Sequence, residues 1–372
     1  MPRRVDRQFV AASLQTHLSK REFFVSESSK PELPLHDARR PDGSAEGSIP
    51  PLDDRRIADL IDMIKESADK LASDRTSRGD LKILSRALRE LRYAFKVFTP
   101  YRAKRKVTVF GSARTPRDAP TYQTAVSLGE KMAQNGWFVV TGAATGIMEA
   151  GHRGAGRECS MGLNIMLPFE QEANEVIRGD DKLVTMKYFF TRKIMFVKEC
   201  DAVVCLPGGF GTLDEAFEVL TLLQTGKREL IPVVFLDAPD GTFWADWLAY
   251  IHEHLLANKM IATEDLSLFR VTDSIDDTIK EVLGFYRVFH SMQYVHGRLV
   301  MRLHRSLSTV RLAAINRDFA DILADGDFRQ EASIVGEPPR PELAGLTRLI
   351  FHFNRRSLGR LRQLIDSING SA

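Results

Sequence analysis

One stretch, residues 203–215, limits most strongly what this chain can fold into. It begins with an apolar run and continues through a proline and three closely spaced glycines into an amphipathic pattern. This order predicts a buried strand, a tight glycine loop and the N-terminus of a helix. A helix N-terminus presents unpaired backbone N–H groups and the positive end of the helix dipole, so we expect this loop to bind a phosphate group.

Short apolar runs alternate with helical patterns around this stretch. The alternation indicates βαβ units and therefore an α/β fold with a doubly wound, Rossmann-like parallel sheet, extended by helices at both ends of the chain. Ligands of such sheets bind beyond the carboxyl ends of the strands. Glycine-containing loops follow three predicted strands, and we expect them to face one crevice: Gly111, residues 142–146 and residues 208–211.

The 372 residues divide into four predicted regions. The first is polar and rich in structure-breaking residues, the second and fourth carry helical patterns, and the third holds the strand–helix alternation. The four regions are a weakly structured segment at 1–50, a helical extension at 51–104, a Rossmann-like domain at 105–290 and an arginine-rich helical region at 291–372.

The C-terminal region has two interpretations. Helices are predicted at 299–315, 319–323 and 346–368, and most basic residues there are arginines. Repeated arginines near a chain end can bind nucleic acid or other anions. The alternative is a solvated helix face, and we adopt that interpretation, so nucleic acid is not an expected partner.

Composition restricts where the protein works. The formal net charge of +3 is too small to imply nucleic-acid binding by itself. No window approaches the roughly 18 uninterrupted apolar residues of a membrane helix, and no apolar core follows the charged N-terminus as it would in a secretory signal. The three cysteines are an odd number without metal-ligand spacing. We therefore expect a cytoplasmic protein that does not associate with membranes.

Glu215 has a structural and a functional interpretation. Thr212 is expected at the helix N-cap, and the Thr212-x-x-Glu215 spacing fits a capping box, in which the glutamate is structural. Glu215 could equally be a catalytic carboxylate, and the residues alone leave both interpretations open. In either case a carboxylate beside a helix N-terminus should be ionised at neutral pH. The loop lacks the Walker sequence and the dinucleotide-binding spacing.

Two adjacent cations, Arg192 and Lys193, occur in a predicted helix at 188–199 that is otherwise aromatic and aliphatic. Arginine offers a planar fork for phosphate or carboxylate, and lysine a point charge. A pair of surface side chains that extend to solvent is the alternative. Because Phe189 and Phe196 share a face with Arg192, we favour a functional pair. The histidines form no metal-binding pattern, so no metal is expected.

An Arg-Lys pair followed by Pro-Gly-Gly-x-Gly-Thr-x-x-Glu resembles the hallmark of the LOG (Lonely Guy) family, whose members are often labelled lysine decarboxylase-like. Arg192–Lys193 and residues 207–215 carry the pattern here. Residues 110–112, residues 146–150 and Thr221 add to the resemblance, which covers roughly residues 105–285. The additional segments at both ends resemble the longer bacterial type.

Members of this family are phosphoribohydrolases, which cleave the N-glycosidic bond of a nucleoside 5′-monophosphate to free base and ribose 5-phosphate. Plant-type members act on cytokinin ribotides, and related bacterial members act on AMP and other nucleotides. The resemblance implies that Arg192 and Glu215 are the catalytic pair, without any cofactor, and that the protein is a homo-oligomer. It also implies a set of substrate-binding residues: Ser112, Gly146, Glu170, Lys193, Gly208, Gly209, Phe210, Gly211, Thr212 and Thr221.

Two further observations bear on activity. Ala143 and Ala144 stand where the family usually has glycines, and their methyl groups would limit how closely a ligand approaches the backbone. A non-catalytic protein that carries a nucleotide or a molybdenum cofactor is the alternative function on the same fold. Because both Arg192 and Glu215 are present, we favour the enzyme.

Overall fold

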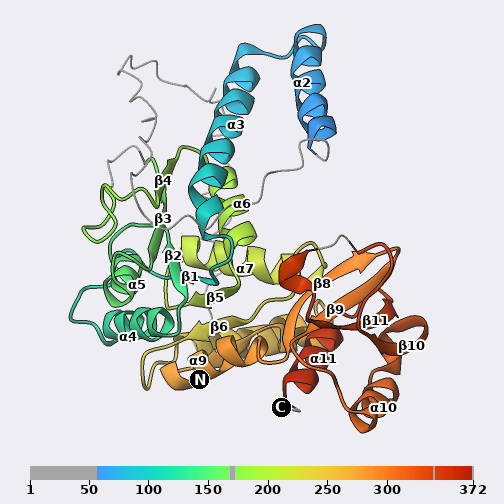
Figure 1. Ribbon diagram of the computed structural model, residues 1–372. Helices are drawn as coiled ribbons and strands as arrows, with labels where there is room; N and C mark the ends of the chain where they lie inside the picture. Colours follow the sequence, from blue (N-terminus) through green and yellow to red (C-terminus); the bar gives the residue numbers. More distant parts are fainter. Residues whose placement is uncertain (1–56, 168–171, 338–339, 371–372) are drawn as a thin grey trace, which may run out of the picture. The chain divides into compact units, whose positions relative to one another are not determined.

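The computed structural model describes residues 57–167, 172–337 and 340–370 (Figure 1). The predicted segment at 1–50 and the predicted substrate-binding residue Glu170 lie outside these residues. Among the helices that the structure describes, none is long and apolar enough to cross a membrane.

A seven-stranded, all-parallel sheet forms the centre of the Rossmann-like part, which confirms the predicted fold class. Every residue of β1 and β5 is buried, because helices cover both faces of the sheet. In sheet order the strands are β4 (Leu183–Met186), β3 (Ser160–Ile165), β2 (Phe138–Thr141), β1 (Lys106–Phe110), β5 (Ala202–Cys205), β6 (Val233–Leu236) and β7 (Arg270–Thr272).

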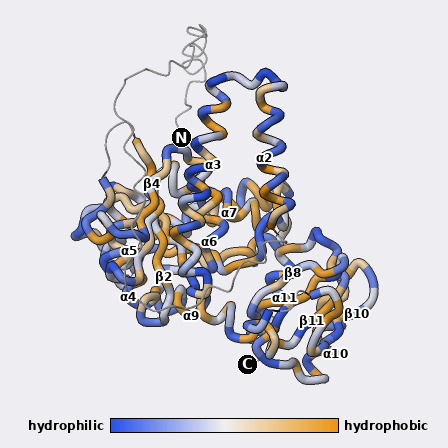
Figure 2. Tube along the Cα trace, turned by 45° about the horizontal axis from the view of Figure 1, so that its top comes forward, coloured by the Kyte–Doolittle hydropathy of each residue, from blue (hydrophilic) through white to orange (hydrophobic). Residues whose placement is uncertain are grey.

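Side chains of alternate strand residues enter two different cores, one on each face of the sheet. Val107 and Val109 of β1 pack in the first core, which also contains residues of α4 (Pro120–Gln134), α5 (Ile147–Ala155) and α9 (Ile275–Phe285). Phe110 of β1 packs in the second core, which also contains residues of α3 (Arg78–Phe98), α6 (Phe189–Glu199), α7 (Phe210–Gln224) and α8 (Phe243–Tyr250). Figure 2 shows the apolar residues concentrated along the strands. Shorter helical turns complete this part: η2 (Thr99–Tyr101), η3 (Ile251–Leu256) and η4 (Thr263–Leu268).

Two helices form the described part of the N-terminal extension: α2 (Ala58–Ser73) and α3 (Arg78–Phe98). Ser77 caps α3, because its side chain accepts a hydrogen bond from the Asp80 N–H. None of the α2 residues is buried. Both helices expose large apolar side chains: Leu60, Ile61, Met63, Ile64, Leu81, Ile83, Leu84 and Leu88. Only the last turns of α3, through Glu90, Ala94 and Phe98, are buried.

The C-terminal region is not all helical, which corrects the prediction. A four-stranded antiparallel sheet in the order β10-β11-β9-β8 replaces the starts of two predicted helices. Leu349, Phe351 and Phe353 recur with the period of two that is typical of a strand, and all three are buried. The elements are β8 (Phe289–Val295), β9 (Arg298–Leu303), α10 (Thr309–Asp318), η5 (Ala320–Ile322), β10 (Leu323–Glu331), η6 (Pro341–Leu343), β11 (Thr347–Phe353) and α11 (Leu358–Gly370).

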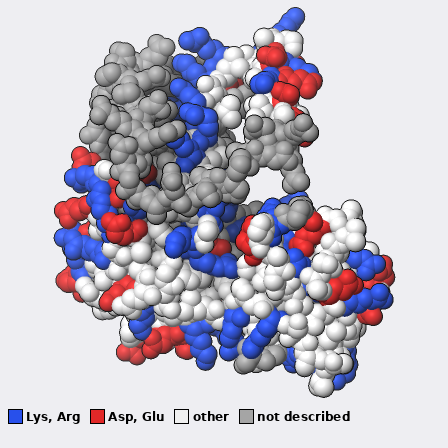
Figure 3. All heavy atoms as spheres, viewed as in Figure 1, with Lys and Arg blue, Asp and Glu red and all other residues white. Residues whose placement is uncertain are grey.

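Several arginines of this region are paired with carboxylates inside the fold, so the prediction of a solvated helix face is wrong for them. Arg302 and Arg348, both buried, donate from Nε to the two carboxylate oxygens of Glu337, at 2.7 and 2.9 Å. Arg362 is buried as well and pairs with Glu281 and Asp366. On the face in Figure 3, positive and negative side chains are interspersed over this region rather than gathered by sign.

Candidate functional site

The glycine loop after β5 leads directly into α7. The helix begins at Phe210 with Gly209 as its N-cap, and no side chain caps it. The expectation that Thr212 is the N-cap is therefore wrong: it lies in the first turn, because the helix begins three residues earlier than the side-chain pattern indicates. Without a Thr212 cap the capping-box interpretation of Glu215 no longer holds.

Gly208 is required by close packing. A Cβ at this position would lie 2.2 Å from the Thr212 Oγ1 and 2.9 Å from the Ser112 backbone nitrogen. A Cβ at Gly209 or Gly211 would meet no heavy atom within 4 Å beyond the adjacent backbone, so these two positions face open space. The Phe210 side chain between them is 92% exposed.

We expect Gly208→Ala to disrupt this loop, whereas Gly211→Ala should leave it intact. The methyl group in Gly208→Ala overlaps backbone as well as side-chain atoms, so the loop must shift. If this loop binds phosphate, as its sequence predicts, affinity for a phosphate-containing ligand should fall by at least about tenfold, because misplaced donors lose their hydrogen bonds to phosphate. Isothermal titration calorimetry with a nucleoside 5′-monophosphate measures this loss. Equal affinities for the two variants would contradict this account of the loop.

Three strand ends come together at this loop. The Ser112 N–H, just beyond β1, donates to the Pro207 carbonyl oxygen at 3.1 Å, and the Ile147 N–H donates to the Ser112 carbonyl oxygen at 3.0 Å. Gly146 has a φ of 65°, and a Cβ there would lie 2.3 Å from the Ser112 carbonyl oxygen. The loops after β1, β2 and β5 are thus adjacent, and they unite Ser112, Gly146 and residues 207–212.

A buried polar network holds the loop after β2. His152 Nε2 lies 3.1 Å from the Thr141 Oγ1, and Asn174 donates to the Ala144 carbonyl oxygen at 3.1 Å. Burial lowers the pKa of His152 to about 4, so this histidine is neutral and structural at neutral pH. Ala143 packs in a small apolar cluster with Ala173 and Ile177, so its methyl group points into the protein.

Helix α6 brings Lys193 to Glu215, across 22 residues of sequence. The Lys193 Nζ lies 3.1 Å from the Glu215 carboxylate, 3.0 Å from that of Asp214 and 2.8 Å from that of Glu218. Burial lowers the pKa of Lys193, but hydrogen bonds and charges of these three carboxylates outweigh it and raise the pKa above its usual range. Lys193 is therefore a cation held in place by three carboxylates of α7. Neither Glu218 nor Asp214 is among the residues predicted for the site, although the helical period places Glu218 on the face of Glu215.

Glu215 itself is 4% exposed. Burial raises the pKa of its carboxyl group, and the positive charges of Lys193 and Arg192 oppose that rise only in part. A carboxylate that is desolvated beside two cations is the environment in which proteins tune an acid or base group.

Arg192 has an unsatisfied donor in this group. Its Nε is buried and has no hydrogen-bond partner among the described residues. The guanidinium lies 5.3 Å from the ring centroids of both Phe189 and Phe196, which hold it by cation–π contacts. Burial lowers the pKa of Arg192, and the charge of Glu215 opposes this effect. A buried N–H without a partner is costly, so Arg192 is suited to donate to an anionic or hydroxyl group of a ligand.

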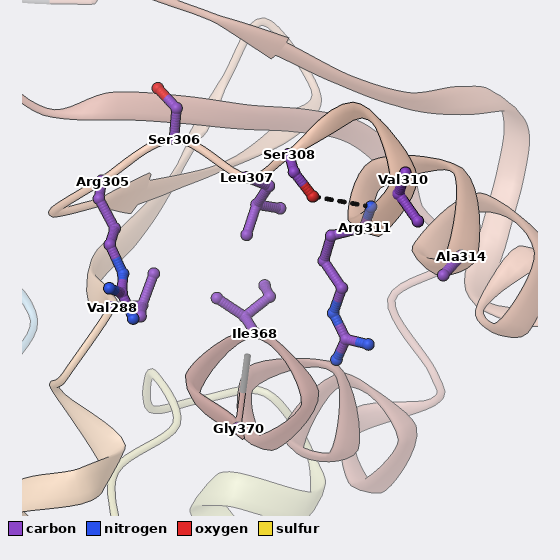
Figure 4. Close-up of a pocket in the computed structure, with 10 residues that line it drawn as sticks. All are labelled: Val288, Arg305, Ser306, Leu307, Ser308, Val310, Arg311, Ala314, Ile368 and Gly370. Atoms are coloured by element: carbon purple, nitrogen blue, oxygen red, sulfur yellow. Dashed lines mark hydrogen bonds between the residues drawn. The ribbon is translucent and has the colours of Figure 1, made fainter. Parts of the chain in front are cut away.

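One predicted residue lies apart from the group. Thr221 is exposed on α7, eleven residues after Phe210 and therefore about 16 Å along the helix. Its hydroxyl donates to the Phe217 carbonyl oxygen. A separate cavity of about 520 Å³ lies in the C-terminal region, where Arg305, Arg311 and Ile368 are among its lining residues (Figure 4). None of the residues predicted for the site lines it.

Comparison with known proteins gives a consistent set of relatives. Residues 140–282 match the protein family described as "Possible lysine decarboxylase". A Mycobacterium tuberculosis protein named cytokinin riboside 5′-monophosphate phosphoribohydrolase is 28% identical over 169 residues, which are 45% of this chain and 88% of that protein. The Oryza sativa protein named cytokinin riboside 5′-monophosphate phosphoribohydrolase LOG is 30% identical over 152 residues, 40% of this chain and 60% of its own length.

Among solved structures, the molybdenum cofactor carrier protein of Chlamydomonas reinhardtii overlaps 48% of this chain and 98% of its own, with a TM-score of 0.34 and 21% identity. That overlap is too slight to bear on ligand or activity.

Proposed function

Since this chain belongs to the LOG family, we propose that it hydrolyses the N-glycosidic bond of a nucleoside 5′-monophosphate, releasing the free base and ribose 5-phosphate. The observation that carries the proposal is the meeting of the buried Glu215 with Arg192 and Lys193 beside the glycine loop. AMP-like nucleotides and cytokinin riboside 5′-monophosphates are the proposed substrates. The proposal also includes a homo-oligomeric state, for which the exposed apolar faces of α2 and α3 provide surface.

Cleavage of this bond passes through a ribose with oxocarbenium character, in which positive charge develops at C1′ and O4′. We assign to Glu215 the stabilisation of that charge and the orientation or deprotonation of the attacking water. The N–H groups at the start of α7 bind the 5′-phosphate and so fix the ribose in place. Lys193 holds the Glu215 carboxylate at 3.1 Å. The buried Arg192 Nε is available to the phosphate or to a ribose hydroxyl.

Lys193 does not fit the alternative suggested by the decarboxylase label. A pyridoxal-phosphate enzyme forms a Schiff base through an uncharged lysine amine, which requires a lowered pKa. Three carboxylates surround Lys193 and raise its pKa instead. Its contacts fit a permanently charged side chain that orients Glu215.

Base release from a panel of nucleoside 5′-monophosphates, compared with base release from the corresponding nucleosides, tests the proposal. The nucleosides lack the phosphate. We expect base release from one or more nucleotides and at least about 10²-fold less from the matching nucleosides, because the phosphate positions the ribose. Free base is measured by liquid chromatography. Tight binding of nucleotides without any base release would favour the non-catalytic carrier instead.

The pH dependence of kcat follows from Glu215. The reaction requires the ionised carboxylate, and burial raises its pKa above that of an ordinary glutamate. Activity should therefore fall as the pH drops through that raised pKa, with an acid limb above the value of about 4.3 for a free glutamate. Initial rates at saturating nucleotide between about pH 4 and pH 9 measure the limb. A kcat that stays constant down to pH ~4 would contradict this assignment.

A further inference from the structure

Helix α3 lies outside the segment that matches the family, yet one of its side chains reaches α6. Glu90 is 2% exposed, and its carboxylate accepts hydrogen bonds from the Lys187 backbone N–H at 2.9 Å and from the Thr191 hydroxyl at 2.8 Å. Lys187 lies two residues before the start of α6, and Thr191 lies in its first turn, immediately before Arg192. Glu90 therefore contacts α6 at the end from which the Arg-Lys pair projects.

The environment of Glu90 favours a fixed position of this carboxylate. A negative charge at a helix N-terminus is stabilised by the helix dipole and satisfies donors that have no partner within the helix. Arg86, one turn earlier on α3, donates from Nε to the Glu90 Oε1 at 2.8 Å and balances the buried charge. An apolar side chain of similar volume would leave Arg86, the Lys187 N–H and the Thr191 hydroxyl without their acceptor, which costs stability. It could not form the two directional bonds, to Lys187 and Thr191, that fix the start of α6 relative to α3.

We propose that Glu90 is a positioning residue of the active site, which holds the first turn of α6 and thereby places Arg192 and Lys193 against Glu215. This inference rests on the proposed function, since positioning has a kinetic effect only where the group is catalytic. It gives the helical extension a role in the reaction: α3 supplies the outer support of the site across 101 residues of sequence, from Glu90 to Thr191.

Two substitutions separate positioning from packing. Glu90→Leu keeps the volume but removes all acceptors, and Glu90→Gln keeps one carbonyl acceptor without the charge. We expect Glu90→Leu to lower kcat by about 10- to 100-fold with a much smaller change in KM, because small displacements of catalytic groups are costly. The kcat of Glu90→Gln should lie between that of the wild type and that of Glu90→Leu. Glu66→Gln on α2 is the matched control, because that exposed carboxylate pairs with Lys70, one turn away, and with no other cation of the described residues.

The acid limb of kcat is the second readout, and one that a purely structural role would not move. Lys193 and Arg192 lower the pKa of Glu215 against the effect of burial. If α6 shifts in Glu90→Leu, the two cations stabilise the Glu215 carboxylate less. The pKa of Glu215 then rises, and the acid limb moves to higher pH. Thr191→Val removes the hydroxyl that donates to Glu90. Its effect on kcat should therefore be much smaller in the Glu90→Leu background than in the wild type.

Hydrogen exchange of the backbone amides at 187–193 completes the experiment and is independent of activity. We expect faster exchange in this segment of Glu90→Leu than in the wild type and in Glu66→Gln. Exchange in Glu90→Leu as slow as in the wild type would overturn the positioning role. A Glu90→Leu variant whose kcat per folded molecule and acid limb equal those of the wild type would overturn it as well. If the wild type itself releases no base, the proposed function fails, and the exchange of 187–193 alone decides whether Glu90 holds α6.

Discussion

Glu215→Gln should lower kcat for nucleotide hydrolysis by about 10²- to 10⁴-fold, the range that a general base or acid contributes. The amide has nearly the same shape as the carboxylate and can still contact Lys193, which lies 3.1 Å away. It carries no negative charge to stabilise the ribose cation and cannot take a proton from water. Substrate affinity should change much less, because in the proposed mode of binding the loop, and not Glu215, holds the phosphate.

Steady-state kinetics and calorimetric binding of AMP to the inactive variant separate these effects. Glu130→Gln on α4 provides the control. That glutamate is exposed, and α4 packs on the opposite face of the parallel sheet from α7. Glu215→Gln with a kcat within about threefold of the wild type would remove Glu215 from the reaction, because a charge-stabilising group contributes far more.

Arg192→Lys should reduce kcat/KM by about 10²- to 10³-fold, which is the usual cost of one donor in an electrostatic site. The guanidinium is planar and fits between Phe189 and Phe196, with its buried Nε free among the described residues. Lysine keeps the charge but has neither the planar shape nor the directed N–H groups. Charge alone is therefore predicted to be insufficient at this position.

The division of the loss between kcat and KM then assigns the ligand of Arg192. A raised KM with unchanged kcat indicates a contact that is equally strong in the bound nucleotide, such as one to the phosphate. A lowered kcat indicates a contact that strengthens in the transition state, such as one to the ribose. Arg89→Lys, an exposed position on α3, is the control for the substitution itself. An Arg192→Lys variant as active as that control would contradict the role assigned to Arg192.

The sequence predicted the parallel sheet because its signals are local. Strands such as β1 and β5 are short apolar runs that end in glycine loops, and their order along the chain determines a βαβ connection. The sequence did not predict the antiparallel sheet after residue 289, because the residue pattern of its strands is ambiguous. β9 and β11 are central strands of that sheet, and their apolar residues, interrupted by a few basic ones, also fit the pattern of an amphipathic helix with a solvated face.

The site could be predicted only where its residues share a motif. Residues 207–215 and the Arg-Lys pair are recognisable from spacing, whereas the start of α7 at Phe210 is not, because backbone geometry rather than a capping side chain determines it. The contacts of Lys193 with Asp214 and Glu218 depend on how α6 packs against α7. Glu90 gives no signal in the sequence, since an isolated glutamate on an amphipathic helix resembles any surface charge until α3 is placed against α6.

The most direct test of the central claim is a product balance for one nucleotide substrate in phosphate-free buffer. Free base is quantified by chromatography, and ribose 5-phosphate is quantified by mass spectrometry, for the wild type and for Glu215→Gln. The account predicts equal amounts of the two products with the wild type, no release of orthophosphate, and almost no product with the variant. Orthophosphate with intact nucleoside, or base release that Glu215→Gln does not reduce, would contradict it.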